Sequence, residues 1–181
     1  MGEQRDPRTA PNLAAIFAVL ARHAVRFVLF GSGGAAAYGA NVTPGDLDIC
    51  PDPAPENLRR LADALVELAA RPRVIPGWTT TEERAAWRPI PATLERLDHL
   101  YETAFGDFDV VPCPFGPKGA EDRFTYADLV ARAVTLDAFG AEITVADVDD
   151  LIASKMSRQR VKDVRAYPEL ARLRAKASRD R

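Results

Sequence analysis

The sequence is poor in the residues that build disulfide frameworks and most zinc sites: its 181 residues include two cysteines and two histidines. Cys50 and Cys113 are too few for either kind of site, and we expect both to be free, buried thiols. Neither His23 nor His99 lies in a motif, and neither is placed to activate a cysteine nucleophile. These shortages disfavour disulfide-stapled, zinc-dependent and cysteine-nucleophile classes of protein.

Long apolar runs are also missing. No run approaches the ~18 residues that a membrane-spanning helix requires. The N-terminus, MGEQRDPRTAPN, lacks the basic and then apolar layout of a secretory signal. We therefore expect a cytoplasmic protein with no membrane association.

Charge is nearly balanced overall, with a net value of −2, but it is unevenly distributed. The segment from Lys155 to Arg181 has ten Lys or Arg and three Asp or Glu, a net +7, which leaves −9 for the rest. This asymmetry is compatible with a polyanionic partner near the C-terminus and equally with a solvated basic helix face.

The length fits a single domain, residues 1–181, and the apolar pattern predicts an α/β (α+β) fold. We expect a mixed β-sheet flanked by helices, with 146–181 forming a basic helical C-terminal region. The pattern predicts helices over 12–24, 35–40, 55–70, 148–160 and 161–176, the last interrupted by Pro168. It predicts strands over 26–30, 46–50 (stopped by Pro51) and 73–75, hairpins 99–103/108–112 and 133–137/142–145, and irregular structure through the rest of 71–97.

Two carboxylates lie close together in the second predicted strand. Asp46 and Asp48 are separated by one residue, so on a strand their side chains point to the same face, whereas Leu47 and Ile49 face the core. Adjacent carboxylates repel each other, and a divalent cation with oxygen ligands, such as Mg²⁺, removes this penalty. The pair is therefore a candidate metal site.

A third acid, Asp109, lies alone in the apolar strand Phe108-Asp109-Val110-Val111. A single charge in such a strand is costly unless it is paired or coordinated. If this strand neighbours that of Asp48, three carboxylates share one cavity, which is sufficient for two-metal phosphoryl transfer.

A glycine-rich turn supplies a possible phosphate site. Gly31-Ser32 lies between an apolar strand and a predicted short helix. Glycine allows the backbone to approach a phosphate closely, the start of a helix offers free N–H groups, and Ser32 adds a hydroxyl donor.

The stretch FVLFGSGGAAAYGANVTPGDLDICPD resembles the nucleotidyltransferase superfamily, whose fold is shared with DNA polymerase beta. More narrowly, it resembles the AbiEii-type and related minimal nucleotidyltransferases, many of them toxins of type IV toxin–antitoxin pairs. The stretch VADVDDLIASKMSRQRVKDVRAY is similar to a helix of the same proteins that carries Asp-Leu-Ile-x-x-Lys, followed by Lys-Asp.

The resemblance implies roles for individual residues. Asp46, Asp48 and Asp109 would be catalytic and would bind Mg²⁺ (or Mn²⁺). The nucleoside triphosphate (NTP) substrate would contact the residues matching the phosphate-binding pair and the helix motif, namely Gly31, Ser32, Lys155, Lys162 and Asp163. One departure concerns the Arg-x-Thr that many relatives carry ahead of the first Asp, because Val42, Pro44 and Gly45 occupy that stretch here.

Several functions are compatible with these residues. The resemblance and the basic C-terminus favour transfer of a nucleoside monophosphate to the 3′ end of tRNA by a growth-inhibiting toxin with a cognate antitoxin protein. One alternative is transfer to an aminoglycoside-like small molecule, for which an acidic pocket would come from Glu82, Glu83, Glu95 and Asp98. Further alternatives are AMPylation of a partner protein and a non-catalytic nucleotide-binding module.

Overall fold

The computed structural model describes residues 10–90, 93–118, 121–158 and 161–177, with the side chains at 158, 161–166 and 176–177 outside the description. The helices are α1 (Leu13–Arg22), α2 (Gly31–Ala37), α3 (Pro55–Glu67), α4 (Thr81–Ala86), α5 (Tyr126–Val130), α6 (Val148–Arg158) and α7 (Val161–Ala177), with a 3₁₀ turn η1 at Leu94–Arg96. The strands are β1 (Phe27–Leu29), β2 (Leu47–Pro51), β3 (Arg71–Pro72), β4 (Leu100–Thr103), β5 (Gly106–Val110), β6 (Val134–Ala138) and β7 (Ala141–Val145).

Within these ranges, seven strands form one sheet in the order β3-β4-β5-β2-β1-β7-β6. The pairs β2–β5 and β1–β7 are parallel and the other neighbours are antiparallel, so the sheet is mixed. The predicted α/β class with a mixed sheet and a helical C-terminal end is therefore confirmed. Both predicted hairpins, β4–β5 and β6–β7, are present.

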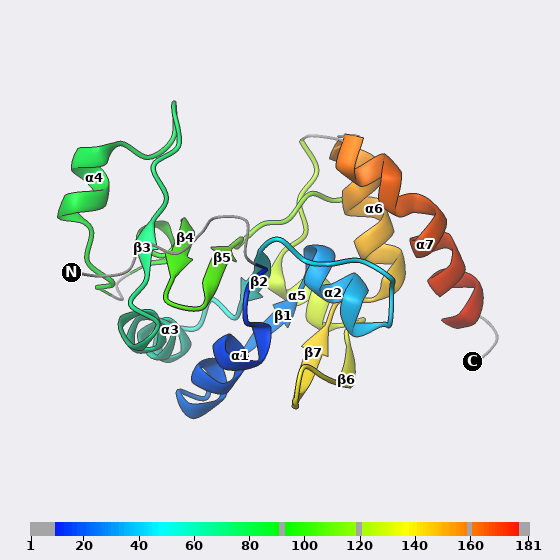
Figure 1. The fold of residues 1–181 in the computed structure, drawn as a ribbon, viewed down its shortest axis with the longest axis horizontal. Helices are drawn as coiled ribbons and strands as arrows, with labels where there is room; N and C mark the ends of the chain where they lie inside the picture. The colour runs from blue at the N-terminus through cyan, green and yellow to red at the C-terminus, as the bar shows by residue number, and fades with distance from the viewer. Residues whose placement is uncertain (1–9, 91–92, 119–120, 159–160, 178–181) are drawn as a thin grey trace.

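The two faces of the sheet are covered differently. Helices α1 and α3 pack on one face, where their apolar residues join inward residues of β2, β4 and β5 in the largest core cluster. On the other face, α5 and Leu151 of α6 pack against Val28 and Cys50. Figure 1 shows α4 at one end of the molecule and α6 and α7 at the other. Asp48 alternates with Leu47 and Ile49, both fully buried in the α1/α3 core, and so belongs to the opposite face.

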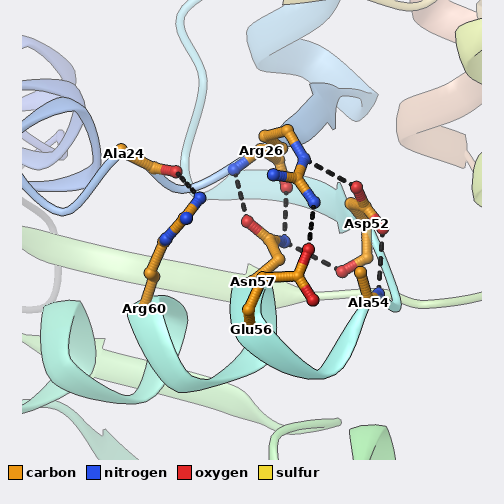
Figure 2. A network of polar contacts seen from close by, with 7 residues as sticks. All are labelled: Ala24, Arg26, Asp52, Ala54, Glu56, Asn57 and Arg60. Atoms are coloured by element: carbon orange, nitrogen blue, oxygen red, sulfur yellow. Dashed lines mark hydrogen bonds and ion pairs between the residues drawn. The ribbon is translucent and has the colours of Figure 1, made fainter.

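A polar network fixes one end of the β1–β2 pair (Figure 2). The side chain of Asn57, on α3, is fully buried. Its amide donates to the carbonyls of Arg26 (2.9 Å) and Asp52 (2.8 Å), and its Oδ1 accepts from the Arg26 N–H (2.7 Å). Arg26 also pairs with Asp52 and Glu56. The network holds the start of β1 and the end of β2 against α3, and thereby fixes the register of the two strands.

The two predictions about proline had different outcomes. The second strand ends at Pro51 as predicted, although Pro51 is itself its last residue, opposite Phe27. The N–H of Asp52 donates to the carbonyl of Arg26, just before β1, so Pro51 occupies a position from which no donor toward β1 is required. Pro168 does not interrupt α7, which continues past it. Leu170 and Leu173 beyond the proline pack against Val148, and this burial offsets the lost helix bond.

Other boundaries also differ from the predictions. The third strand is β3 at 71–72, and Ile75 forms only an isolated bridge to Thr79. Helix α2 begins at Gly31 and not at residue 35. Helices α4 and α5 were not predicted, although each begins with a capping box, Thr80 with Glu83 and Thr125 with Asp128.

The prediction of two buried thiols is correct for one cysteine. Cys50 is buried, and burial raises the pKa of its thiol to about 12. Cys113 is exposed, because it follows the end of β5 in a bend outside the sheet.

Candidate functional site

The site is centred on two acids that backbone pairing brings side by side. Asp48 on β2 and Asp109 on β5 are register partners on adjacent parallel strands. Neighbouring strands lie about 4.8 Å apart, and partners in register point to the same face of the sheet. The two carboxylates therefore share one side of the sheet, opposite the core of α1 and α3. The strand of Asp109 thus neighbours the strand of Asp48, which the sequence analysis could only assume.

Gly31 covers Asp48. The N–H of Phe30 donates to the carbonyl of Asp48 (3.0 Å), so the residue that follows, Gly31, lies directly against the Asp48 side chain. Its φ is +62°, and a Cβ at this position would overlap Asp48 Oδ2. A left-handed backbone and the absence of a side chain are both required here, so only glycine fits without movement. The glycine therefore allows the start of α2 to pack directly against the carboxylate.

Ser32 follows as the second residue of α2 and is partly exposed. The first N–H groups of a helix have no intrahelical acceptor, so the N–H groups of Gly31 and Ser32 remain available to a ligand. Tight packing holds this turn in place, since Gly33 lies against Leu29 and Leu47, and Gly34 against Leu151 of α6.

Asp109 is 4% exposed. Burial raises its pKa to about 8, and the nearby charge of Asp48 adds to the effect. Arg73 opposes the shift, while Asp46 contributes a smaller repulsion in the same direction as Asp48. Asp46 precedes β2 and is partly exposed. The other two predicted acids, Asp46 and Asp48, are thus close enough to affect the ionisation of Asp109.

Arg73 is the residue that the sequence analysis missed. Its Nη2 donates to Asp109 Oδ1 and its Nη1 to Asp107 Oδ2, both at 2.6 Å. In the sequence Arg73 only begins a short predicted strand, and its importance depends on β3 and β4 lying beside β5. No local signal reveals that arrangement.

Oxygen donors from Asp46, Asp48 and Asp109 are the kind that Mg²⁺ and Mn²⁺ prefer. In the part of the chain that the structure describes, no three Asp, Glu, His or Cys side chains converge into a group that could hold a metal ion as they stand. One oxygen of Asp109 is engaged by Arg73. The donor chemistry and the mutual repulsion of the acids fit a divalent cation, and Arg73 competes with such a cation for Asp109.

The other predicted nucleotide contacts are on the C-terminal helices. Lys155 is partly buried on α6, one turn beyond Leu151, which packs on α2. The Tyr167 hydroxyl donates to the carbonyl of Lys155 (3.4 Å). Lys162 and Asp163 fall on α7, but their side chains lie outside the described ones.

The basic C-terminal region is partly engaged within the chain itself. Arg172 pairs with Glu169 (2.7 Å) and donates to the carbonyl of Gly39. Arg174 pairs with Asp149 (2.8 Å). Apart from Lys155, the other basic side chains from 155 to 181 lie outside the described ones.

The acidic pocket considered for a small-molecule acceptor is only partly formed. Glu83 and Glu95 line a pocket of about 390 Å³ between α4 and η1, but Arg88 and Arg96 line it too. Neither Glu82 nor Asp98 belongs to its lining. Its charge is therefore mixed, which gives no preference for a cationic acceptor.

Comparisons of the chain with protein-family models, with curated proteins and with solved structures found no match. None of the helices in the described ranges combines the length and the apolar character that a membrane crossing requires.

Proposed function

We propose that this chain has a nucleotidyltransferase fold and transfers a nucleoside monophosphate from an NTP to an acceptor hydroxyl, with release of pyrophosphate. The observation that carries the proposal is the pairing of Asp48 with Asp109 on adjacent parallel strands, with Gly31 lying against Asp48. Paired carboxylates beside a glycine turn at the start of a helix are the parts that phosphoryl transfer needs, because such catalysis is mainly positioning and charge neutralisation.

Asp46, Asp48 and Asp109 would hold Mg²⁺ or Mn²⁺, which when bound neutralises charge on the triphosphate and the leaving pyrophosphate. The N–H groups of Gly31 and Ser32, with the Ser32 hydroxyl, donate to phosphate oxygens. These contacts orient the triphosphate with its α-phosphorus facing the acceptor.

We assign Asp109 the role of proton acceptor, because it is buried beside Asp48 and faces the same side of the sheet. The acceptor oxygen forms a bond to the α-phosphorus, the bond from that phosphorus to pyrophosphate breaks, and Asp109 takes the proton of the acceptor hydroxyl. Lys155, Lys162 and Asp163 are further proposed contacts to the nucleotide.

For the acceptor we propose the 3′ end of tRNA, which would make the chain a growth-inhibiting toxin. The net charge of +7 from Lys155 to Arg181 supports an RNA partner through phosphate contacts. The ion pairs of Arg172 and Arg174 reduce the charge that is free to bind RNA, so the support comes from the rest of the region.

Incubation with each α-labelled NTP, Mg²⁺ and total RNA tests the proposal. Wild type should label a tRNA-sized band, and Asp48→Asn should lower the label by at least about a hundredfold, because the isosteric amide removes the charge and keeps the shape. Asp137→Asn, an exposed change on the distant β6–β7 hairpin, is the control. Label on a small molecule or on a co-expressed protein, with none on RNA, would show that the acceptor is that molecule and not tRNA. No transfer to any acceptor would refute the proposal.

Growth on induced expression tests the toxin role separately. Cells that express wild type should stop growing, whereas cells that express Asp48→Asn at the same level should grow normally. Equal growth with both proteins would reject the toxin role and leave the transfer reaction to be judged by the labelling experiment.

A further inference from the structure

Arg73 lies in the same row of the sheet as the two paired acids. Its N–H donates to the carbonyl of Leu100 (2.7 Å), Leu100 is the register partner of Asp109, and Asp109 is the partner of Asp48. The side chain of Arg73 therefore extends from the end of β3 across β4 and reaches the acid on β5. This reach places a permanent positive charge beside the candidate metal site.

The guanidinium of Arg73 bridges two carboxylates. Asp107 and Asp109 are two residues apart on β5 and so face the same side, and one nitrogen of the fork bonds to each at 2.6 Å. The two acids differ in burial: the Asp107 side chain is 38% exposed and the Asp109 side chain 6%. Asp107 thus binds the guanidinium of Arg73 near solvent, whereas Asp109 binds it within the site.

The ion pair between Arg73 and Asp109 also limits the binding of a metal ion at the site. Asp109 is buried beside the charge of Asp48, and the positive charge of Arg73 stabilises the ionised form of Asp109. A cation that engages one oxygen of Asp109 competes with any second cation for the same carboxylate and repels it. Arg73 itself is incompletely satisfied, since its buried Nε has no acceptor among the described residues.

We propose that Arg73 is a positioning residue that holds Asp109 while no metal and triphosphate are bound, and that it yields Asp109 to the metal when they bind. Asp107 retains the guanidinium, so the released charge stays at the edge of the site, within reach of an anionic ligand. The inference rests on the proposed function and adds a regulatory feature to it: the metal alone binds weakly, and the metal together with a triphosphate binds well.

Binding of Mn²⁺ in mildly alkaline buffer, followed by the electron paramagnetic resonance signal of the free ion, tests this role without any measurement of activity. Arg73→Gln removes the competing cation and should bind Mn²⁺ about tenfold more tightly than wild type when no triphosphate is present. Arg71→Gln is the matched control: it removes one positive charge two residues away, and within the described residues the Arg71 side chain donates to the carbonyl of Ala70 and to no acid. It should bind Mn²⁺ as wild type does. Arg73→Lys keeps a positive charge but lacks the two-armed fork of the guanidinium. Its affinity for Mn²⁺ should lie between those of wild type and Arg73→Gln.

Thermal melting gives a second readout. Without metal, in the same mildly alkaline buffer, Arg73→Gln should melt below wild type because the charged Asp109 is left buried without a cationic partner. Added Mn²⁺ should raise its melting temperature more than that of wild type, since binding to the folded state stabilises it.

The outcomes separate the inference from the proposed function. Equal or weaker Mn²⁺ binding by Arg73→Gln, alongside Asp48-dependent binding of Mn²⁺ and triphosphate by wild type, would overturn the role of Arg73 alone. No Mn²⁺ binding by either protein, even with a triphosphate present, would overturn both.

Discussion

Asp48 and Asp109 are 61 positions apart in the sequence and directly opposite each other on two adjacent parallel strands. A parallel pair requires a crossover, which α3, β3 and β4 provide. The crossover also brings Arg73 into the same row of the sheet. The position of Asp109 thus determines both the candidate metal site and the cation that competes for it.

Asp109 should make the metal-free protein less stable as pH rises. Burial and Asp48 raise its pKa from 3.8 to about 8 in the folded state, so between these values the folded protein keeps a proton that the unfolded chain has released. The free energy of unfolding should therefore fall as pH rises from about 4 to about 8, by an amount on the order of a few kcal/mol at about 1.4 kcal/mol per pKa unit. Urea denaturation at several pH values in the presence of a chelator measures it.

Asp109→Asn should lack this fall in stability and exceed the wild type in stability above the folded pKa. Asp137→Asn, an exposed control, should follow the wild-type profile. Parallel profiles for wild type and Asp109→Asn would contradict the raised pKa.

Gly31→Ala should disable the site more than it destabilises the fold. The new Cβ would overlap the Asp48 carboxylate, and a displacement of that group should lower activity by roughly a hundredfold. Gly39→Ala separates this overlap from backbone strain, because Gly39 also has positive φ (+84°) but nothing lies within 4 Å of its added Cβ. We expect both to lose about 1 kcal/mol or more of stability from the left-handed backbone, and Gly39→Ala to keep its activity. Equal activities of the two variants would show that the contact of Gly31 with Asp48 is unimportant.

Asn57→Leu should destabilise the fold by roughly 3 kcal/mol, because the N–H of Arg26 and the carbonyl of Asp52, both part-buried, would lose the partner that Asn57 supplies (Figure 2). Arg26→Gln, in the same network, should have little effect because the Arg26 side chain is 45% exposed. Chemical denaturation compares the two. The reverse order of effects would mean that the exposed ion pairs, and not the buried amide, fix the β1–β2 register.

The sequence predicted those parts of the fold whose signals are local. The periodicity of Leu58, Leu61 and Leu65 identified α3, and the turn at Phe139-Gly140 identified the β6–β7 hairpin. The alternation of Asp48 with Leu47 and Ile49 assigned the acid to the face away from the main core. These features depend on neighbours along the chain, so they can be read from it.

The remaining features depend on contacts between distant segments. The ion pair of Arg73 with Asp109 exists only because β3, β4 and β5 are adjacent, and the tolerance of Pro168 depends on the packing of Leu170 and Leu173 in α7. Helix α4 had a local signal in its capping box, but nearby prolines and the absence of buried residues in the helix concealed it. The sequence therefore indicated the acids of the candidate site but not the residue that balances their charge.

Anomalous scattering from crystals grown with Mn²⁺ and a non-hydrolysable NTP analogue tests the central claim most directly. We predict a manganese peak between the carboxylates of Asp48 and Asp109, phosphate oxygens against Gly31 and Ser32, and no peak in Asp48→Asn. A peak elsewhere, or a bound triphosphate with Asp109 still paired to Arg73 and no manganese beside it, would contradict the account.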